Sequence, residues 1–162
     1  MIRILTIVPL TPEAFAPFGD VVEAAGTAPI AINQGFAKRF NDLAAIDVAG
    51  EGGEPNISLF TANPRPVPIA IKLMERHPLG SQLFYPLQDR DWLVVVCADP
   101  HASDTYRAFH ATGRQGVNYR PNTWHHPLLV LDEESRFLIV DRKGPGKNLE
   151  EVWLDQAMVL EG

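Results

Sequence analysis

Residues 67–87 read VPIAIKLMERHPLGSQLFYPL, and this stretch decides whether the chain is expected to be helical or β-rich. A helix would place Ile69 and Leu73, four residues apart, on one side. With a period of two, one face of a strand instead carries Val67, Ile69, Ile71, Leu73, Glu75 and His77. The β-branched content and the flanking prolines favour the strand, because proline interrupts helices. We therefore expect a strand that ends with Glu75 and His77 facing the interior.

The rest of the chain repeats this pattern of short apolar runs between turn residues. Its 162 residues include 14 prolines and 12 glycines, spread along the whole length. Further β-rich runs cover residues 19–23, 56–61, 83–87, 92–98, 105–110, 127–131 and 136–141. Many short strands separated by turns are typical of a β-sandwich or a closed barrel. One short helix is predicted to begin after Thr11, with Pro12 at its first position, and to end at Pro17.

Composition limits the classes of function that need to be considered. No internal repeat, low-complexity tract or charge block divides the chain, so residues 1–162 are expected to form a single domain. The net charge of −6 argues against a nucleic-acid or anionic-membrane partner, since both require a basic face. No apolar run approaches the roughly 20 residues needed to cross a bilayer. The N-terminus lacks the features of a secretory signal, and Cys97 is the single cysteine, so a cytoplasmic protein without an internal disulfide is expected.

The residues best suited to chemistry lie in two clusters, ERHPLGSQ at 75–82 and GVNYRPNTWHHP at 116–127. In the first cluster, the Pro78–Gly80 turn could bring Gln82 back opposite Glu75 and His77. In the second, the adjacent His125 and His126 must point to opposite faces of a strand. We expect His126 to share the pocket face with Trp124. His125 is then expected on the other side, where it would support packing or a dimer contact.

The spacing in these clusters resembles the two metal-binding motifs of cupins. The first motif is represented by Glu75-x-His77, four residues and Gln82, and the second by Pro121-x-Thr123-x-x-His126 with threonine in place of glycine. The metal ligands that this resemblance implies are Glu75, His77, Gln82 and His126. Oxygen and imidazole donors suit a divalent metal, although a neutral amide is a weak ligand. The alternative is that the same groups bind a substrate directly through hydrogen bonds.

Whole phrases of the chain, beyond this spacing, are similar to the ureidoglycolate lyase family. The phrases are residues 14–21, 32–35, 75–82, 107–109, 116–119, 124–128 and 137–142, which together span most of the chain. The resemblance implies an all-β fold with minor α content, a cupin-type antiparallel β-barrel or jelly roll with one or two short helices. It also implies a cytoplasmic homodimer in allantoin and purine-nitrogen breakdown that cleaves ureidoglycolate to glyoxylate and urea. A nickel-type divalent cofactor is part of the same expectation.

The implied reaction assigns roles to particular residues. Ureidoglycolate is a hemiaminal, so cleavage needs a base for its hydroxyl proton and an acid for the departing nitrogen. His77 or His126 is the expected base, with Glu75 orienting the imidazole or assisting as the acid. A guanidinium would pair with the substrate carboxylate. The candidates for substrate binding are Arg39, Arg107 and Arg142 for the carboxylate, Asn33, Asn118 and Tyr119 for the ureido group, and Trp124 as an aromatic contact or a core residue.

Two other functions remain open at this level. One is an amidohydrolase that acts on the same substrate and releases ammonia. The other is a cupin that binds a small carboxylate without converting it, because a cupin barrel by itself does not specify an activity. The products of the reaction distinguish these alternatives. His101 and His110, which lie outside the two clusters, are expected to have structural roles.

Overall fold

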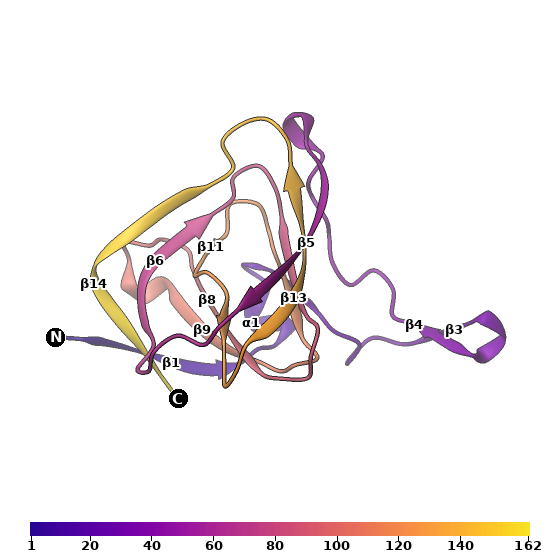
Figure 1. The fold of residues 1–162 in the computed structure, drawn as a ribbon, viewed down its shortest axis with the longest axis horizontal. Coiled ribbons are helices and arrows are strands. Elements are labelled where there is room, and N and C mark those ends of the chain that lie inside the picture. The colour runs from indigo at the N-terminus through magenta and orange to yellow at the C-terminus, as the bar shows by residue number, and fades with distance from the viewer.

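The computed structural model describes residues 1–162 as an all-β protein with one short helix (Figure 1). The elements are β1 (Arg3–Pro9), α1 (Pro12–Phe15), β2 (Gly19–Val22), β3 (Ile30–Ile32), β4 (Ala37–Arg39), β5 (Glu54–Ala62), β6 (Ala70–Arg76), β7 (Gln82–Pro86), β8 (Trp92–Cys97), β9 (Tyr106–Ala111), β10 (Gly116–Tyr119), β11 (Trp124–His125), β12 (Leu129–Val130), β13 (Ser135–Lys143) and β14 (Glu150–Glu161). Short 3₁₀ turns occupy Asn33–Gly35, Gly50–Gly52 and Ser103–Thr105. None of the helices is long and apolar enough to span a membrane.

The strands form three sheets. A seven-stranded sheet has the order β11-β6-β14-β1-β9-β8-β12, and β11 also pairs with β8, so this sheet closes on itself. A five-stranded sheet has the order β2-β10-β7-β13-β5. The third sheet contains only β3 and β4, which form a hairpin that projects from the body on the side of β5 and β13 (Figure 1).

Two hydrophobic cores result from strand alternation in the seven-stranded sheet. On β8, Val94 and Val96 belong to a core that also contains Phe84, Val117 and Ile139 of the five-stranded sheet, so this core lies between the two sheets. The neighbouring residues of β8 belong to a second core built from strands of the seven-stranded sheet alone. The first core holds the two sheets together, and the second fills the closed ring.

The predicted all-β barrel with a short helix is confirmed. Thr11 caps α1, because its hydroxyl accepts a hydrogen bond from the backbone N–H of Ala14 at 3.2 Å. The pairing is antiparallel except at β1, which runs parallel to both β14 and β9. β1, the β3–β4 hairpin and β14 were not predicted. β14 is rich in residues with high helix propensity, and its pairing with β6 and β1 overrides that preference.

The segment that follows Val67 forms a strand, as predicted, but its alternation is not uniform. Ile71 and Met74 both contribute to the second core although they are three residues apart. The register of β14 against β6 shifts between Trp153 and Met158, opposite this part of β6. Such an irregularity moves the later side chains to the other face. Consequently, the strand does not carry the single stripe that the sequence predicted from Val67 to His77.

Candidate active site

The centre of the candidate site is a cross-strand pair between Glu75 on β6 and His125 on β11. These residues are direct partners in the antiparallel pairing of the two strands, so their side chains emerge on the same face. Nε2 of His125 lies 3.5 Å from Oε1 of Glu75. This distance is too long for a good hydrogen bond, although the two groups are close enough to share a cation.

His77 completes a group of three side chains. It follows directly after β6, and its ring centroid lies 5.3 Å from that of His125. One ligand atom from each of Glu75, His77 and His125 lies within 4.8 Å of the other two. The backbone holds His77 in place, because the N–H of Asn122 donates to the His77 carbonyl at 2.9 Å.

Backbone contacts determine which nitrogen of each imidazole carries the proton. Nδ1 of His77 lies 2.8 Å from the carbonyl oxygen of Asn148, and Nδ1 of His125 lies 3.1 Å from that of Thr123. A carbonyl oxygen only accepts hydrogen bonds, so each Nδ1 is the donor and each Nε2 of a neutral ring keeps its lone pair. Both Nε2 atoms are buried and have no hydrogen-bond partner. Two unpaired lone pairs therefore face the same space as the Glu75 carboxylate.

Residues of the five-stranded sheet enclose this group from the opposite side. The ring of Tyr119 on β10 stacks on His125, with centroids 4.1 Å apart and planes inclined by 11°. Gln82 on β7 pairs across the strands with Tyr119, so it lies on the same face. Its Nε2 lies 3.4 Å from Oδ2 of Asp141, and its Oε1 is buried without a partner. Asn56 donates to the other oxygen of Asp141 at 3.0 Å.

The electrostatic surroundings favour a charged Glu75 and a neutral His77. Burial raises the pKa of Glu75, but interactions with His125, His77 and His126 outweigh it, so the pKa lies below its usual value. Burial lowers the pKa of His77, as does the neighbouring His125, and the contact with the Asn148 carbonyl offsets only part of this effect. At neutral pH the Glu75 side chain is therefore a carboxylate and the His77 imidazole is unprotonated.

A cleft of about 890 Å³ gives access to His77. Its walls come from the end of β13, the segment before β14 and the start of β14, and its other lining residues are Asp141, Arg142, Lys147, Asn148, Leu149, Glu150 and Glu151. The cleft is rich in acidic side chains. A small polar molecule that enters it reaches His77 directly.

The donor set fits a divalent transition metal. Two imidazole nitrogens and one carboxylate oxygen are typical ligands of such ions, and each imidazole is oriented by a second hydrogen bond from its Nδ1. The buried, unpaired Oε1 of Gln82 is an additional acceptor on the same face. Glu75, His77 and His125 are thus the residues that could hold a metal.

The orientation expected for the two adjacent histidines is reversed in the structure. His125, which was expected on the opposite face, meets Glu75 and His77. His126 is not one of the three converging side chains: it is buried, its Nδ1 lies 2.7 Å from the carbonyl oxygen of Pro127, and its backbone N–H donates to the carbonyl of Val95. Burial is the main cause that lowers the pKa of His126 to about 4. The pairing of His125 with Glu75 sets the face, and sequence spacing does not reveal that pairing.

Of the side chains predicted to bind substrate, only Tyr119 reaches the histidines. Arg107 donates to the carbonyls of Asp104 and Tyr106 and lines a different pocket of about 660 Å³ together with Trp124. The ring of Trp124 packs against the second core and lies 4.6 Å below the guanidinium of Arg76.

The remaining candidates make other contacts. Arg142 lines the cleft beside His77, but it is buried and donates to the carbonyls of Gly50, Glu51 and Pro145. The amide of Asn118 donates to Asp20 and to the carbonyl of Ala45. Asn33 and Arg39 belong to the projecting hairpin.

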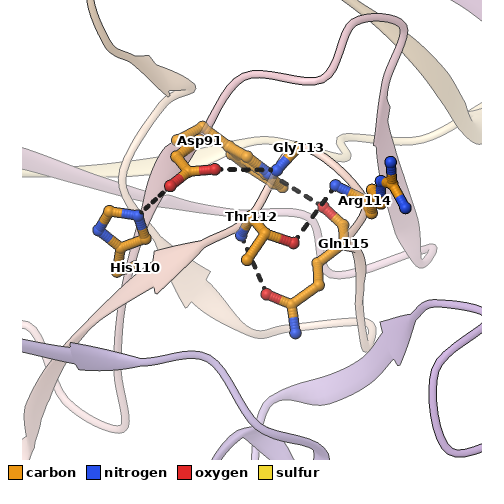
Figure 2. Close-up of polar contacts among 7 residues, drawn as sticks. Asp91, His110, Thr112, Gly113, Arg114 and Gln115 are labelled. Atoms are coloured by element: carbon orange, nitrogen blue, oxygen red, sulfur yellow. Dashed lines mark hydrogen bonds and ion pairs between the residues drawn. The ribbon is translucent and has the colours of Figure 1, made fainter.

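A second histidine–carboxylate pair lies elsewhere and differs in character (Figure 2). Nε2 of His110 is 2.7 Å from one oxygen of Asp91, whose other oxygen accepts the backbone N–H of Gly113 at 3.2 Å (Figure 2). Both side chains of the pair are about half exposed. The Asp91 carboxylate thus bridges β9 and the turn that follows it. This arrangement agrees with the structural role expected for His110.

Asp141 and Asn148 belong to the site but were not singled out from the sequence, and His125 was assigned to the opposite face. Asp141 has a recognisable signal, because Phe137, Ile139 and Asp141 alternate along one strand, and a polar residue therefore ends an apolar stripe. Asn148 acts through its backbone carbonyl on His77 and through its side chain, which accepts the N–H of Leu79 at 2.7 Å. A carbonyl contact of this kind has no sequence signature.

Several known proteins are similar to this chain. The family model described as "Ureidoglycolate lyase" matches residues 2–161. "Ureidoglycolate lyase 1" of Rhizobium meliloti is 52% identical over 161 residues, which cover 99% of this chain and 95% of that protein. "Ureidoglycolate lyase" of Burkholderia cepacia is 54% identical over 160 residues, which cover 98% of this chain and 90% of that protein. Among solved structures, oxalate decarboxylase from Bacillus subtilis aligns with a TM-score of 0.40 and 16% identity over 67% of this chain and 29% of that chain.

Proposed function

Because the chain belongs to the ureidoglycolate lyase family, we propose that it is a carbon–nitrogen lyase that splits ureidoglycolate into glyoxylate and urea, at the site built around Glu75, His77 and His125. The observation that carries the proposal is the convergence of two buried, unpaired imidazole nitrogens on a carboxylate. We further propose that the enzyme is a cytoplasmic homodimer that acts in the breakdown of allantoin and purine nitrogen.

The resident group of this site is, in our proposal, a divalent transition metal such as nickel. Glu75, His77 and His125 would hold it, with the amide oxygen of Gln82 as a further ligand. Asp141 supports this arrangement, since its contact with Nε2 of Gln82 leaves Oε1 as the free end of the amide. When bound, the metal would supply Lewis acidity toward an oxygen of the substrate hydroxyl or carboxylate.

The reaction itself requires little more than the transfer of one proton. The carbon–nitrogen bond breaks, its electrons leave with the urea nitrogen, and the hydroxyl oxygen forms the carbonyl of glyoxylate. The hydroxyl loses a proton and the leaving nitrogen gains one. Because the hydroxyl and the nitrogen are bonded to the same carbon, a single well-placed group can accept the proton from one and deliver it to the other.

We assign this proton transfer to the carboxylate of Asp141. It lines the cleft beside His77, and two hydrogen bonds, from Asn56 and Gln82, fix its orientation. Glu75 and His77 are left as metal ligands. This assignment moves the acid–base role away from the histidines that the sequence suggested. We make this assignment because both histidine Nε2 lone pairs point at the space next to Glu75, where they would bind the metal.

The decisive experiment follows glyoxylate, urea and ammonia in one time course with racemic ureidoglycolate and freshly purified protein. A blank without protein corrects for the spontaneous decay of the hemiaminal. Enzyme-dependent glyoxylate with an equal amount of urea is expected. Metal content is measured on the same preparation, and a chelator-treated portion is expected to lose activity and regain it when the divalent ion is restored.

Each contrary outcome has a definite meaning. Glyoxylate accompanied by ammonia instead of urea would replace the lyase by an amidohydrolase. Rates equal to the blank, with and without added divalent metals, would contradict catalysis and favour a protein that only binds a small carboxylate. Full activity in protein that contains no metal would leave the lyase intact and disprove the assigned metal site.

A further inference from the structure

The β3–β4 hairpin forms no strand pairing with the body of the protein. We call residues 30–39 the arm. Every residue of the arm is exposed except Ala37, which is half-buried, and the ring of Phe36 at the tip is 93% exposed. Its two strands pair only with each other. An isolated two-stranded hairpin is marginally stable in water, so an arm of this kind is expected to pack on another surface.

One face of the arm is apolar and carries an arginine. In the antiparallel register, Ile30 pairs with Arg39 and Ile32 pairs with Ala37. These four side chains therefore emerge on one face, while Lys38 emerges on the other. Phe36, in the turn between the two strands, adds an exposed ring at the tip. The arm thus presents an apolar strip that ends in a guanidinium.

A matching apolar surface lies on the five-stranded sheet. Its side chains that face away from the core form a continuous set, which we call the outer face: Ile57, Leu59, Leu83, Tyr85, Leu138 and Val140. Cross-strand pairing connects them, because Leu138 pairs with both Leu59 and Tyr85, and Val140 pairs with both Ile57 and Leu83. Ile57 is 71% exposed and Leu59 is 64% exposed. A contiguous exposed apolar patch is typical of an interaction surface.

The arm and the outer face lie on the same side of the molecule. In Figure 1 the hairpin extends past β5 and β13, away from the sheet to which these strands belong. The arm of one chain therefore does not cover its own outer face. In a dimer with a two-fold axis, however, each arm would meet the outer face of the other chain, and both apolar surfaces would be buried in one symmetric interface.

The charge of the arm also favours docking onto a second copy of this chain. Residues 24–41 contain Lys38 and Arg39 and no acidic residue, although the whole chain has a net charge of −6. The cleft beside His77 is lined by Asp141, Glu150 and Glu151. It opens near the end of β13, where Arg142 follows Val140 on the outer side of the strand and Asp141 lies on the inner side. A basic arm that lies along the outer face of a second chain would therefore reach an acidic rim.

The site of a single chain also lacks a free guanidinium for a carboxylate substrate. The guanidinium of Arg142 is occupied by backbone carbonyls. Arg76 is bound to Glu150 at 2.6 Å and lies over Trp124. Lys147 is the only other cation that lines the cleft. Apart from the proposed metal, the cleft of a single chain therefore offers little free positive charge to an anionic substrate.

We propose that the arm of a second copy of this chain packs on the outer face and brings Arg39 to the rim of the cleft, where its guanidinium binds the substrate carboxylate. The active site is thereby shared between two chains. The docking of the arm rests on the two apolar surfaces alone. The role of Arg39 rests in addition on the proposed function, because it assumes a substrate with a carboxylate.

The docking is tested by measuring the molecular mass of the protein in solution. Sedimentation velocity is expected to give twice 17.9 kDa for the unaltered chain. Phe36→Asp on the arm and Leu59→Asp on the outer face are each expected to shift the protein to the monomer. Val67→Asp is the matched control, since Val67 is 82% exposed and belongs to neither surface. A monomeric unaltered chain, or a dimer that persists in both surface variants, would overturn the proposal.

The sharing of the site is tested by mixing two defective variants. Arg39→Ala is expected to raise KM for ureidoglycolate about 10- to 100-fold, the loss typical of a charge-assisted hydrogen bond. Glu75→Gln is expected to abolish turnover at its own site. After random exchange of subunits, half of the dimers carry one of each chain, and each of these contains one intact site. The mixture should recover about one quarter of the unaltered activity at a substrate concentration that is limiting for Arg39→Ala.

The outcomes separate this proposal from the proposed function. An unaltered chain without lyase activity contradicts the proposed function, whereas the sedimentation result still tests the docking. An active dimer whose mixed variants recover no activity contradicts the shared site. As a control, Glu75→Gln is mixed with Asp141→Asn, two variants altered in the same site. This mixture is expected to recover no activity, whereas the mixture of Glu75→Gln with Arg39→Ala is expected to recover it.

Discussion

The ring of Tyr119 lies flat against the ring of His125, with centroids 4.1 Å apart and an interplanar angle of 11°. Tyr119 belongs to the five-stranded sheet and His125 to the seven-stranded sheet. The position of His125, a proposed metal ligand, therefore depends directly on how the two sheets pack. Tyr119 is itself held by edge contacts with Phe84, at 5.7 Å, in the core between the sheets.

Replacement of Tyr119 tests whether this stack positions His125. Tyr119→Phe keeps the ring and is expected to retain turnover within about 3-fold. Tyr119→Leu removes the flat surface and is expected to lower kcat about 10-fold or more, since small displacements of a reacting group are costly. Steady-state kinetics distinguish kcat from KM, and circular dichroism checks the fold. Equal activity of the two variants would show that the stack has no positioning role.

The adjacent histidines provide a sharp internal comparison. His125→Asn removes a proposed ligand and is expected to reduce both the metal content and the turnover by about 100-fold or more, as in other sites that lose a ligand. His126→Asn, one residue away, is expected to keep the metal. Elemental analysis of the purified proteins makes the measurement, and thermal unfolding controls for stability. Metal loss in His126→Asn but not in His125→Asn would restore the assignment suggested by sequence spacing.

Arg142 is expected to matter for stability more than for substrate binding. Its guanidinium connects the Gly50–Glu51 turn with Pro145, and lysine cannot replace these several directed contacts. Arg142→Lys is expected to lower the free energy of unfolding by about 2–3 kcal/mol, as when a buried group loses charge-assisted hydrogen bonds. Urea denaturation measures this change. A large rise in KM without loss of stability would instead place Arg142 at the substrate.

Cys97 is expected to be chemically inert in the folded protein. It is 2% exposed, and burial is the first cause that raises the pKa of its thiol to about 12. The reactive thiolate is therefore present only at a pH well above the neutral range. Alkylation between pH 7 and 9 followed by mass spectrometry is expected to leave the native protein unlabelled and to label it fully in denaturant. Rapid labelling of the native protein at pH 8 would contradict this description.

The local sequence pattern was enough to predict the class of fold and the two segments that contain Glu75, His77 and His125. Proline and glycine occur at short intervals with β-branched runs between them, and this pattern predicts a β-rich fold. The capped helix after Thr11 could likewise be predicted from neighbouring residues alone. Glu75 and His77 could be placed on one face because two residues that are two apart in a strand always share it. These features depend on interactions within a few residues.

The tertiary structure decided which histidine joins Glu75 and which side chains can meet a substrate. His125 was selected by its pairing with Glu75, and a register one residue different would have selected His126. Arg142, Asn33 and Arg39 were predicted at one site by residue type, but their positions depend on loops and on a projecting hairpin. Strand register and the packing of distant segments arise from contacts between residues far apart in the chain. A local pattern does not contain that information, so only the folded structure could supply it.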